Sequence, residues 1–168
     1  MKKSVFKISV IASLLLILFS TSSCGIGLIV RGAVKSSLSV EKKTVPPNFI
    51  DNKEVLLVLL WGENSYDDYV KKAFEKFYDG KKEFVTFEQY FSGKYNDVNK
   101  FAYVFSQGPG EKKMYTGEPY SFTYEGSRSF HVYDRKNEKF YRSKINSGFF
   151  ARVIQGYAMK LDKIRKNK

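Results

Sequence analysis

The stretch Val55-Leu56-Leu57-Val58-Leu59-Leu60-Trp61 is an unbroken run of apolar residues, bounded by Lys53-Glu54 before it and Gly62-Glu63 after it. A run of this length predicts a strand that is covered on both faces, as in a sheet packed between helices. We therefore expect this strand to be buried inside the fold.

An amphipathic helix is expected directly after this strand. Ser65 is followed by Asp68 at close to the capping-box spacing, and Asp67 and Asp68 lie where a helix amino terminus favours negative charge. Asp79-Gly80 supplies a turn that ends the helix. The apolar positions recur at helical spacing and are Tyr69, Val70, Ala73, Phe74, Phe77 and Tyr78.

Two further strands are expected after this helix, over Phe84–Phe87 and Phe101–Phe105, with a single helical turn over Glu88–Ser92 between them. The order strand, helix, strand, turn, strand predicts parallel pairing with right-handed crossovers.

Beyond Gly108-Pro109-Gly110 the pattern changes to alternation, with turns expected at Glu125–Ser127 and Asp134–Lys139. This predicts antiparallel hairpins. A closing helix is expected from Ser147 to about Lys166. The predicted fold class is α/β or α+β: a mixed sheet with a parallel strand-helix-strand start, then antiparallel hairpins, packed by two main helices. The alternating positions are Tyr120, Phe122, Tyr124, Phe130, Val132, Tyr133, Phe140 and Tyr141.

The amino terminus has the layout of an export signal. Lys2, Lys3 and Lys7 precede the uncharged, mostly apolar run Ile8–Phe19, which is followed by the small residues Ser20–Ser23. A helix that spans a bilayer needs about 20 apolar residues, so this run is short for a permanent anchor.

The only cysteine of the chain follows the small residues, in Thr21-Ser22-Ser23-Cys24-Gly25. This segment resembles a lipobox, with Thr21 in place of the usual large aliphatic residue. Variants rich in serine and threonine resemble those of Bacteroidetes lipoproteins. The resemblance implies cleavage before Cys24, attachment of lipid (palmitate) to it, and a membrane location. The alternative is an ordinary secretory signal that leaves Cys24 as a free thiol.

These features divide the chain into three parts. Residues 1–23 are expected to be a removed signal peptide, residues 24–48 a lipidated cysteine with a flexible tether that ends in Pro46-Pro47, and residues 49–168 a single globular domain. The apolar patch Ile26–Val30 within the tether has two interpretations, which are contact with lipid or a first strand.

The chain is strongly basic. Three of its 29 basic residues and none of its 17 acidic residues lie in the first 23 positions, so the remaining 145 residues carry a formal charge of +9. An exported lipoprotein seldom meets nucleic acid, so anionic lipid headgroups or acidic envelope glycans are the expected counter-charges. The alternative is a solvated basic surface with no partner.

Few residues offer catalytic chemistry. The one cysteine is expected to be acylated, and the one histidine, His131, lies in an expected strand where it points to solvent or fills a cross-strand position. Neither a metal nor a cofactor is expected, because several His or Cys ligands are normally needed. The candidate ligand-facing residues are Glu63, Asp67, Asp68, Lys112 and Lys113.

The first functional hypothesis is a non-enzymatic envelope lipoprotein that binds a protein partner or an anionic envelope component. It would be favoured by an exposed aromatic and basic patch, for which the candidates are Tyr115, Tyr120, Tyr124, Arg128 and Arg135. A structural subunit of an outer-membrane assembly is a related alternative. The rival is a hydrolase or transferase on envelope sugars, which would need two of Glu63, Asp67, Asp68 and Glu111 to face one cleft.

The element order is similar to the amino-terminal α/β domains of envelope proteins such as TolB and to domains related to the curli secretion lipoprotein. The whole chain also looks like small Bacteroidetes lipoproteins. No functional residue follows from either resemblance. Because the residues after Cys24 are uncharged until Arg31, without the acidic cluster that resembles a surface-export tag, we expect the domain to face the periplasm from the outer membrane.

Overall fold

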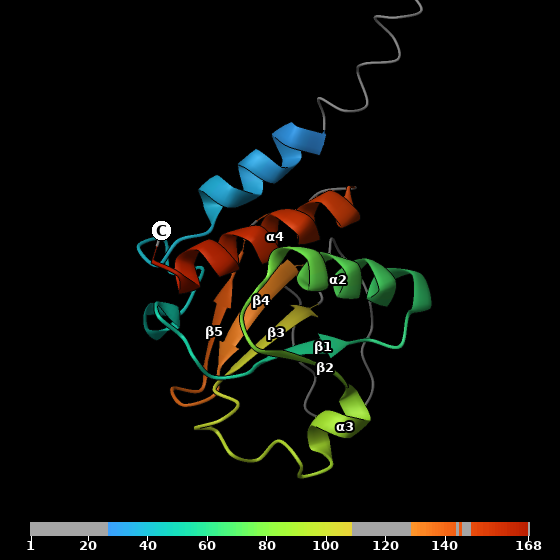
Figure 1. Ribbon diagram of the computed structural model, residues 1–168, viewed down its shortest axis with the longest axis vertical. Helices are drawn as coiled ribbons and strands as arrows, with labels where there is room; N and C mark the ends of the chain where they lie inside the picture. The colour runs from blue at the N-terminus through green and yellow to red at the C-terminus, as the bar shows by residue number, and fades with distance from the viewer. Residues whose placement is uncertain (1–26, 109–128, 144, 146–148, 168) are drawn as a thin grey trace, which may run out of the picture.

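The computed structural model describes residues 27–108, 129–143, 145 and 149–167. In this part of the chain a five-stranded mixed sheet has the order β2-β1-β3-β4-β5, with helices packed on one face and a short helix on the other (Figure 1). The predicted mixed sheet is confirmed, and its class is α+β. The elements are a helix over residues 27–37, the 3-10 helix η1 (Pro47–Phe49), β1 (Leu56–Leu60), α2 (Asn64–Phe77), β2 (Lys82–Thr86), α3 (Phe87–Phe91), β3 (Tyr103–Gly108), β4 (Ser129–Asp134), β5 (Lys139–Arg142) and α4 (Phe150–Arg165).

Strand β1 is a buried interior strand of the sheet, as its apolar run predicts. It pairs in parallel with β2 on one side and with β3 on the other, and each of its five residues is buried. Its two faces contribute to two separate apolar clusters: Leu56, Val58 and Leu60 to one, and Leu57 and Leu59 to the other.

The larger apolar cluster lies between the sheet and helices α2 and α4. The expected closing helix is α4, which packs on the sheet. Its buried stripe consists of Val153, Ile154, Tyr157 and Leu161, with Phe150 and Ile164 partly buried beside them. On α2 the buried residues include Val70, Ala73 and Phe74. No helix among the described residues is long and apolar enough to cross a bilayer.

The opposite face of the sheet is covered by α3 and by the segment that follows it. Tyr95 and Phe101 of that segment are buried with Val85 and Val104, and their rings meet edge to face at a centroid distance of 5.1 Å. Helix α3 begins with a capping box in which Thr86 and Gln89 exchange hydrogen bonds.

Strands β4 and β5 form the antiparallel hairpin that the alternation predicts. Asp134 holds its turn: one carboxylate oxygen accepts hydrogen bonds from the backbone N–H groups of Lys136 and Asn137 at 3.1 and 3.2 Å. The expected hairpin around Tyr120–Tyr124 lies outside the described residues.

Several predicted boundaries were wrong by a few residues. The second strand ends at Thr86, and Phe87, which we had assigned to it, begins α3 because the capping box starts the helix there. The third strand begins at Tyr103 and not at Phe101, whose ring is buried against the face that α3 covers.

The expected flexible tether over residues 24–48 is contradicted in its described part. Residues 27–37 form a helix, which we call the leading helix, and Val34, Leu38 and Val45 are fully buried in the larger apolar cluster. Of the two interpretations left open for the apolar patch, a first strand is therefore wrong. The physical reason is close packing against α4, where Gly156 has no side chain and the leading helix approaches it (Figure 1).

Candidate functional site

Open sheets of parallel strands usually bind ligands at the carboxyl edge of these strands. Because β1 and β3 are parallel neighbours, the turn after β1 and Gly108 at the end of β3 lie at the same edge of the sheet. Lys112 and Lys113 lie outside the described residues, as do Cys24 and Glu111.

The three carboxylates at this edge have different environments. Asp67 is buried, and its two oxygens accept hydrogen bonds from the backbone N–H groups of Trp61 at 3.0 Å and Gly62 at 2.8 Å. Glu63 is partly buried at the N-cap of α2, and Asp68 is exposed. Asp67 therefore fastens the turn between β1 and α2.

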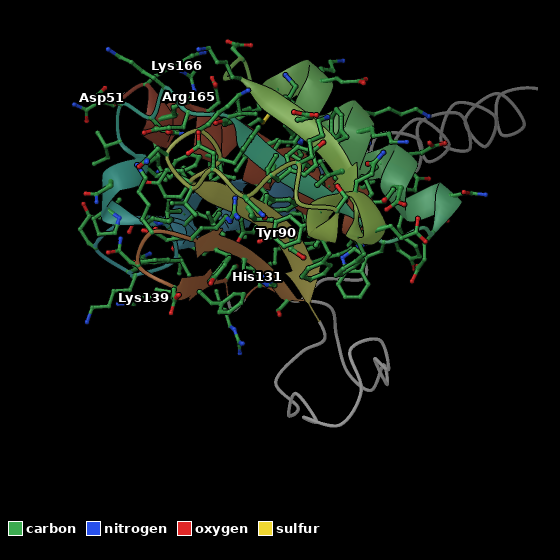
Figure 2. All side chains as sticks on the ribbon, turned by 90° about the horizontal axis from the view of Figure 1, so that it is seen from below. Asp51, Tyr90, His131, Lys139, Arg165 and Lys166 are labelled. Carbon is green, nitrogen blue, oxygen red and sulfur yellow. The ribbon has the colours of Figure 1, made fainter. Side chains whose placement is uncertain are left out.

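A second candidate surface lies on the face of the sheet that α3 covers, where β4 and β5 extend beyond it. Cross-strand pairing places His131 opposite Arg142 and Tyr133 opposite Phe140. The surface also contains Tyr90 of α3, which Figure 2 shows in the same region as His131. We call this the aromatic–basic face, and its members are Tyr90, His131, Tyr133, Arg135, Phe140 and Arg142.

The rings of this face are in mutual contact. Tyr133 and Phe140 stack at a centroid distance of 4.4 Å, and His131 meets Phe140 edge-on at 5.1 Å. The Arg142 guanidinium lies 5.7 Å from the centre of the Phe140 ring, within the range of a cation–π contact. Phe140 nevertheless remains 46% exposed. A ring already held by its neighbours, yet open to solvent, loses little conformational entropy when a partner covers it.

The guanidinium group of Arg135 is also held in place by its neighbours. One guanidinium nitrogen donates to the backbone carbonyls of Tyr95 at 2.6 Å and Phe101 at 3.0 Å, while the guanidinium lies 5.5 Å from the centre of the Tyr90 ring. Of the patch candidates proposed from sequence, Arg135 is on this face, and Tyr115, Tyr120, Tyr124 and Arg128 lie outside the described residues.

His131 is neutral at physiological pH. Burial of the imidazole, reinforced by the charge of Arg142, lowers the pKa of His131 to about 4. Its cross-strand position was one of the two anticipated from sequence. The charge of the face at pH 7 therefore comes from its arginines.

His131 also lies opposite Ser106 of β3. The described hydrogen bonds of Ser106 and of the neighbouring carboxylate Asp134 do not form a catalytic relay through His131. The Ser106 hydroxyl donates to the backbone carbonyl of Gln107 at 3.1 Å, and the carboxylate of Asp134 accepts hydrogen bonds from its own hairpin turn. Among the described residues, no group of three or more His, Cys, Asp or Glu side chains could hold a metal ion.

The sequence interpretation missed Tyr133, Phe140 and Arg142 as surface residues. The signal was present in the alternation of β4 and β5, since residues two apart share a face of a strand. What alternation alone does not show is which face the helices cover.

Comparison with protein families, with curated proteins and with solved structures finds no match to this chain.

Proposed function

We propose that this chain is a lipid-anchored protein of the cell envelope, held by Cys24, whose aromatic–basic face binds an acidic protein partner. The observation that carries the binding proposal is the stack of Tyr133 on the half-exposed Phe140 ring, which Arg142 covers in part. Arg135 lies over the ring of Tyr90 on the same face. Tyr, Phe and Arg are the side chains enriched at protein–protein interfaces, and anchored rings are typical of their energetic centres.

The anchoring part of the proposal depends on the lipobox-like segment that ends at Cys24. Two or three acyl chains on this residue would make membrane attachment effectively permanent. We further propose that the protein faces the periplasm from the outer membrane. Mass spectrometry of the amino-terminal peptide from purified protein tests the acylation, and protease digestion of intact cells tests the orientation.

The binding proposal is tested by crosslinking in cells, followed by capture of the protein. The test variant combines Phe140→Ala with Arg142→Glu, and the control variant combines Ile50→Ala with Lys72→Glu, which are also exposed but lie outside the face. We expect a reproducible partner with the wild type and the control that is largely lost with the test variant. Equal capture by all three proteins would contradict the proposal. If the test variant instead loses a bound acidic glycan, the ligand of this face is an envelope polymer and not a protein.

The enzymatic alternative has less support from the geometry of the described residues. It needs two carboxylates that face one cleft, but Asp67 uses both oxygens on the backbone of Trp61 and Gly62. Asp68 is exposed on the helix surface. The non-enzymatic binding module therefore remains our proposal.

A further inference from the structure

The first described residue of the leading helix, Gly27, lies only three residues after Cys24. Three extended residues span at most about 11 Å. An acylated Cys24 would lie at the bilayer surface, so Gly27 must lie close to that surface too. Because Val34 and Leu38 are buried in the core, the helix cannot move away from the domain without exposing them.

The first described turn of this helix exposes apolar side chains to solvent. Leu28 is 61% exposed and Ile29 is 72% exposed, whereas Val30 is packed against the core. Among the described residues Ile29 is the most exposed large apolar side chain. Solvent exposure of two adjacent aliphatic side chains is unfavourable, and burial in an apolar medium would relieve it.

Helix α4 begins beside this turn. A Cβ atom on Gly27 would lie 3.1 Å from the Nε atom of Arg152, and Phe149, the N-cap residue of α4, is 53% exposed. Arg31 and Lys35 add positive charge along the leading helix, which has no acidic residue. We call this the membrane-facing patch, and its members are Leu28, Ile29, Arg31, Lys35, Phe149 and Arg152.

The directions of the leading helix and α4 also bring the members of the membrane-facing patch together. The leading helix and α4 run in the same direction, since Gly27 lies by Arg152 and Val34 lies by Gly156 (Figure 1). Gly27 and the amino terminus of α4, with the partial positive charge of that helix end, therefore lie at one end of the molecule. The start of α2 carries the acidic residues Glu63 and Asp68. Because their charge is opposite to that of the patch, the patch is limited to the leading helix and α4.

We propose that the membrane-facing patch rests on the bilayer, with Leu28 and Ile29 inserted among anionic phospholipid headgroups, so that the lipid anchor holds the domain in one orientation. This inference depends on the proposed acylation of Cys24. Aliphatic side chains flanked by Arg and Lys are the composition that interfacial helices use. The domain is thus held directly at the membrane and not at the end of a tether.

The test uses the full acylated protein, reconstituted into vesicles of phosphatidylethanolamine and phosphatidylglycerol. Acylation blocks the only native thiol, so Leu28→Cys can be labelled with an environment-sensitive fluorophore and quenched by spin-labelled lipids. Val98→Cys is the control, because Val98 is also exposed and belongs to the segment between α3 and β3, which covers the face of the sheet opposite α4. Thermal unfolding of both variants is compared with that of the wild type to establish that they fold.

We expect the label at residue 28 to be quenched several-fold more strongly than the label at residue 98. Equal quenching at the two positions in protein with acylated Cys24 would overturn the docking proposal and leave the lipid anchor intact. Unmodified Cys24, detected by mass spectrometry of the same sample, would overturn both the anchor and the docking that depends on it.

Discussion

At the scale of single residues, His131 links the sheet to pH. The unfolded chain has an ordinary histidine pKa of about 6.5, whereas burial and Arg142 lower the folded value to about 4. As the pH falls from 6.5 towards 4, the unfolded state therefore takes up a proton that the folded state does not, and stability decreases. We expect this group to remove on the order of 1–3 kcal/mol of stability over that window.

Urea unfolding at pH 7 and pH 4.5 measures this effect when the wild type is compared with His131→Gln. The glutamine variant cannot take up the proton, so it should lose less stability between the two pH values. Parallel losses in both proteins would show that His131 is not responsible.

A second prediction concerns Asp67, whose carboxylate accepts two backbone hydrogen bonds. Asp67→Ala leaves both N–H groups without their acceptor and is expected to cost about 1–3 kcal/mol of unfolding free energy. The exposed neighbour Asp68 supplies the matched control, and Asp68→Ala should change stability by less than about 0.5 kcal/mol. Fluorescence of Trp61, the only tryptophan, reports unfolding beside the altered site. Similar effects of the two substitutions would contradict the structural role of Asp67.

At the scale of elements, sequence periodicity predicted the strands and helices whose apolar patterns are long. Strand β1 and helix α4 were predictable because their patterns are long and continuous. The leading helix was not, because it contains Gly27, Gly32 and two serines, which are poor helix formers. It is stabilised by tertiary packing on α4, and that contact has no signature in a local window.

The aromatic–basic face illustrates the same limit for the candidate site. In β4 and β5 the residues of this face alternate with core residues, but the sequence-based prediction placed Tyr133 and Phe140 in one set with the core positions. Which alternate set the helices cover follows from the packing of α2 and α4 on one face only, and so required the structure. The bonds of Arg135 to carbonyls 34 and 40 residues away are likewise beyond sequence periodicity.

The contact between the leading helix and α4 gives an element-scale prediction. A Cβ atom on Gly156 would lie 2.9 Å from the Cβ atom of Val34 and 3.3 Å from the Cα atom of Arg31. Gly to Ala in a helix interior normally stabilises by about 1 kcal/mol, but here the methyl group must displace a packed helix. We expect Gly156→Ala to lower stability and to accelerate trypsin cleavage after Arg31 and Lys35. Adding Val34→Ala should restore part of the protection, and unchanged cleavage in Gly156→Ala would contradict the docked helix.

At the scale of the whole molecule, a polar cluster joins segments that are far apart in sequence. The carboxylate of Asp162 accepts hydrogen bonds from the backbone N–H of Asp79 at 3.0 Å and from Arg165 at 2.9 Å, and pairs with Lys166 at 2.5 Å. The Arg165 carbonyl accepts from the N–H of Asp51 at 2.9 Å. Figure 2 shows Asp51, Arg165 and Lys166 at one corner of the molecule, away from the aromatic–basic face. This cluster joins the ends of α2 and α4 to the segment before β1.

The last prediction tests whether this cluster stabilises the fold. Burial alone would raise the pKa of Asp162, but the hydrogen bonds from Lys166, Arg165 and the backbone of Asp79 outweigh it and lower the pKa. The stabilisation is therefore present above the unfolded aspartate pKa of about 4 and is lost as the pH falls below it. We expect Asp162→Asn to cost about 1.5–3 kcal/mol at pH 7, because hydrogen bonds to a charged group are replaced by weaker ones. Asp79→Asn is the control, since the Asp79 side chain is 69% exposed and its pair with Lys166 should contribute less than about 1 kcal/mol. Urea unfolding at pH 7 and pH 3 distinguishes the two: the deficit of Asp162→Asn should shrink at pH 3, and a deficit that is the same at both pH values would mean that packing, and not the charge of Asp162, holds the two helix ends together.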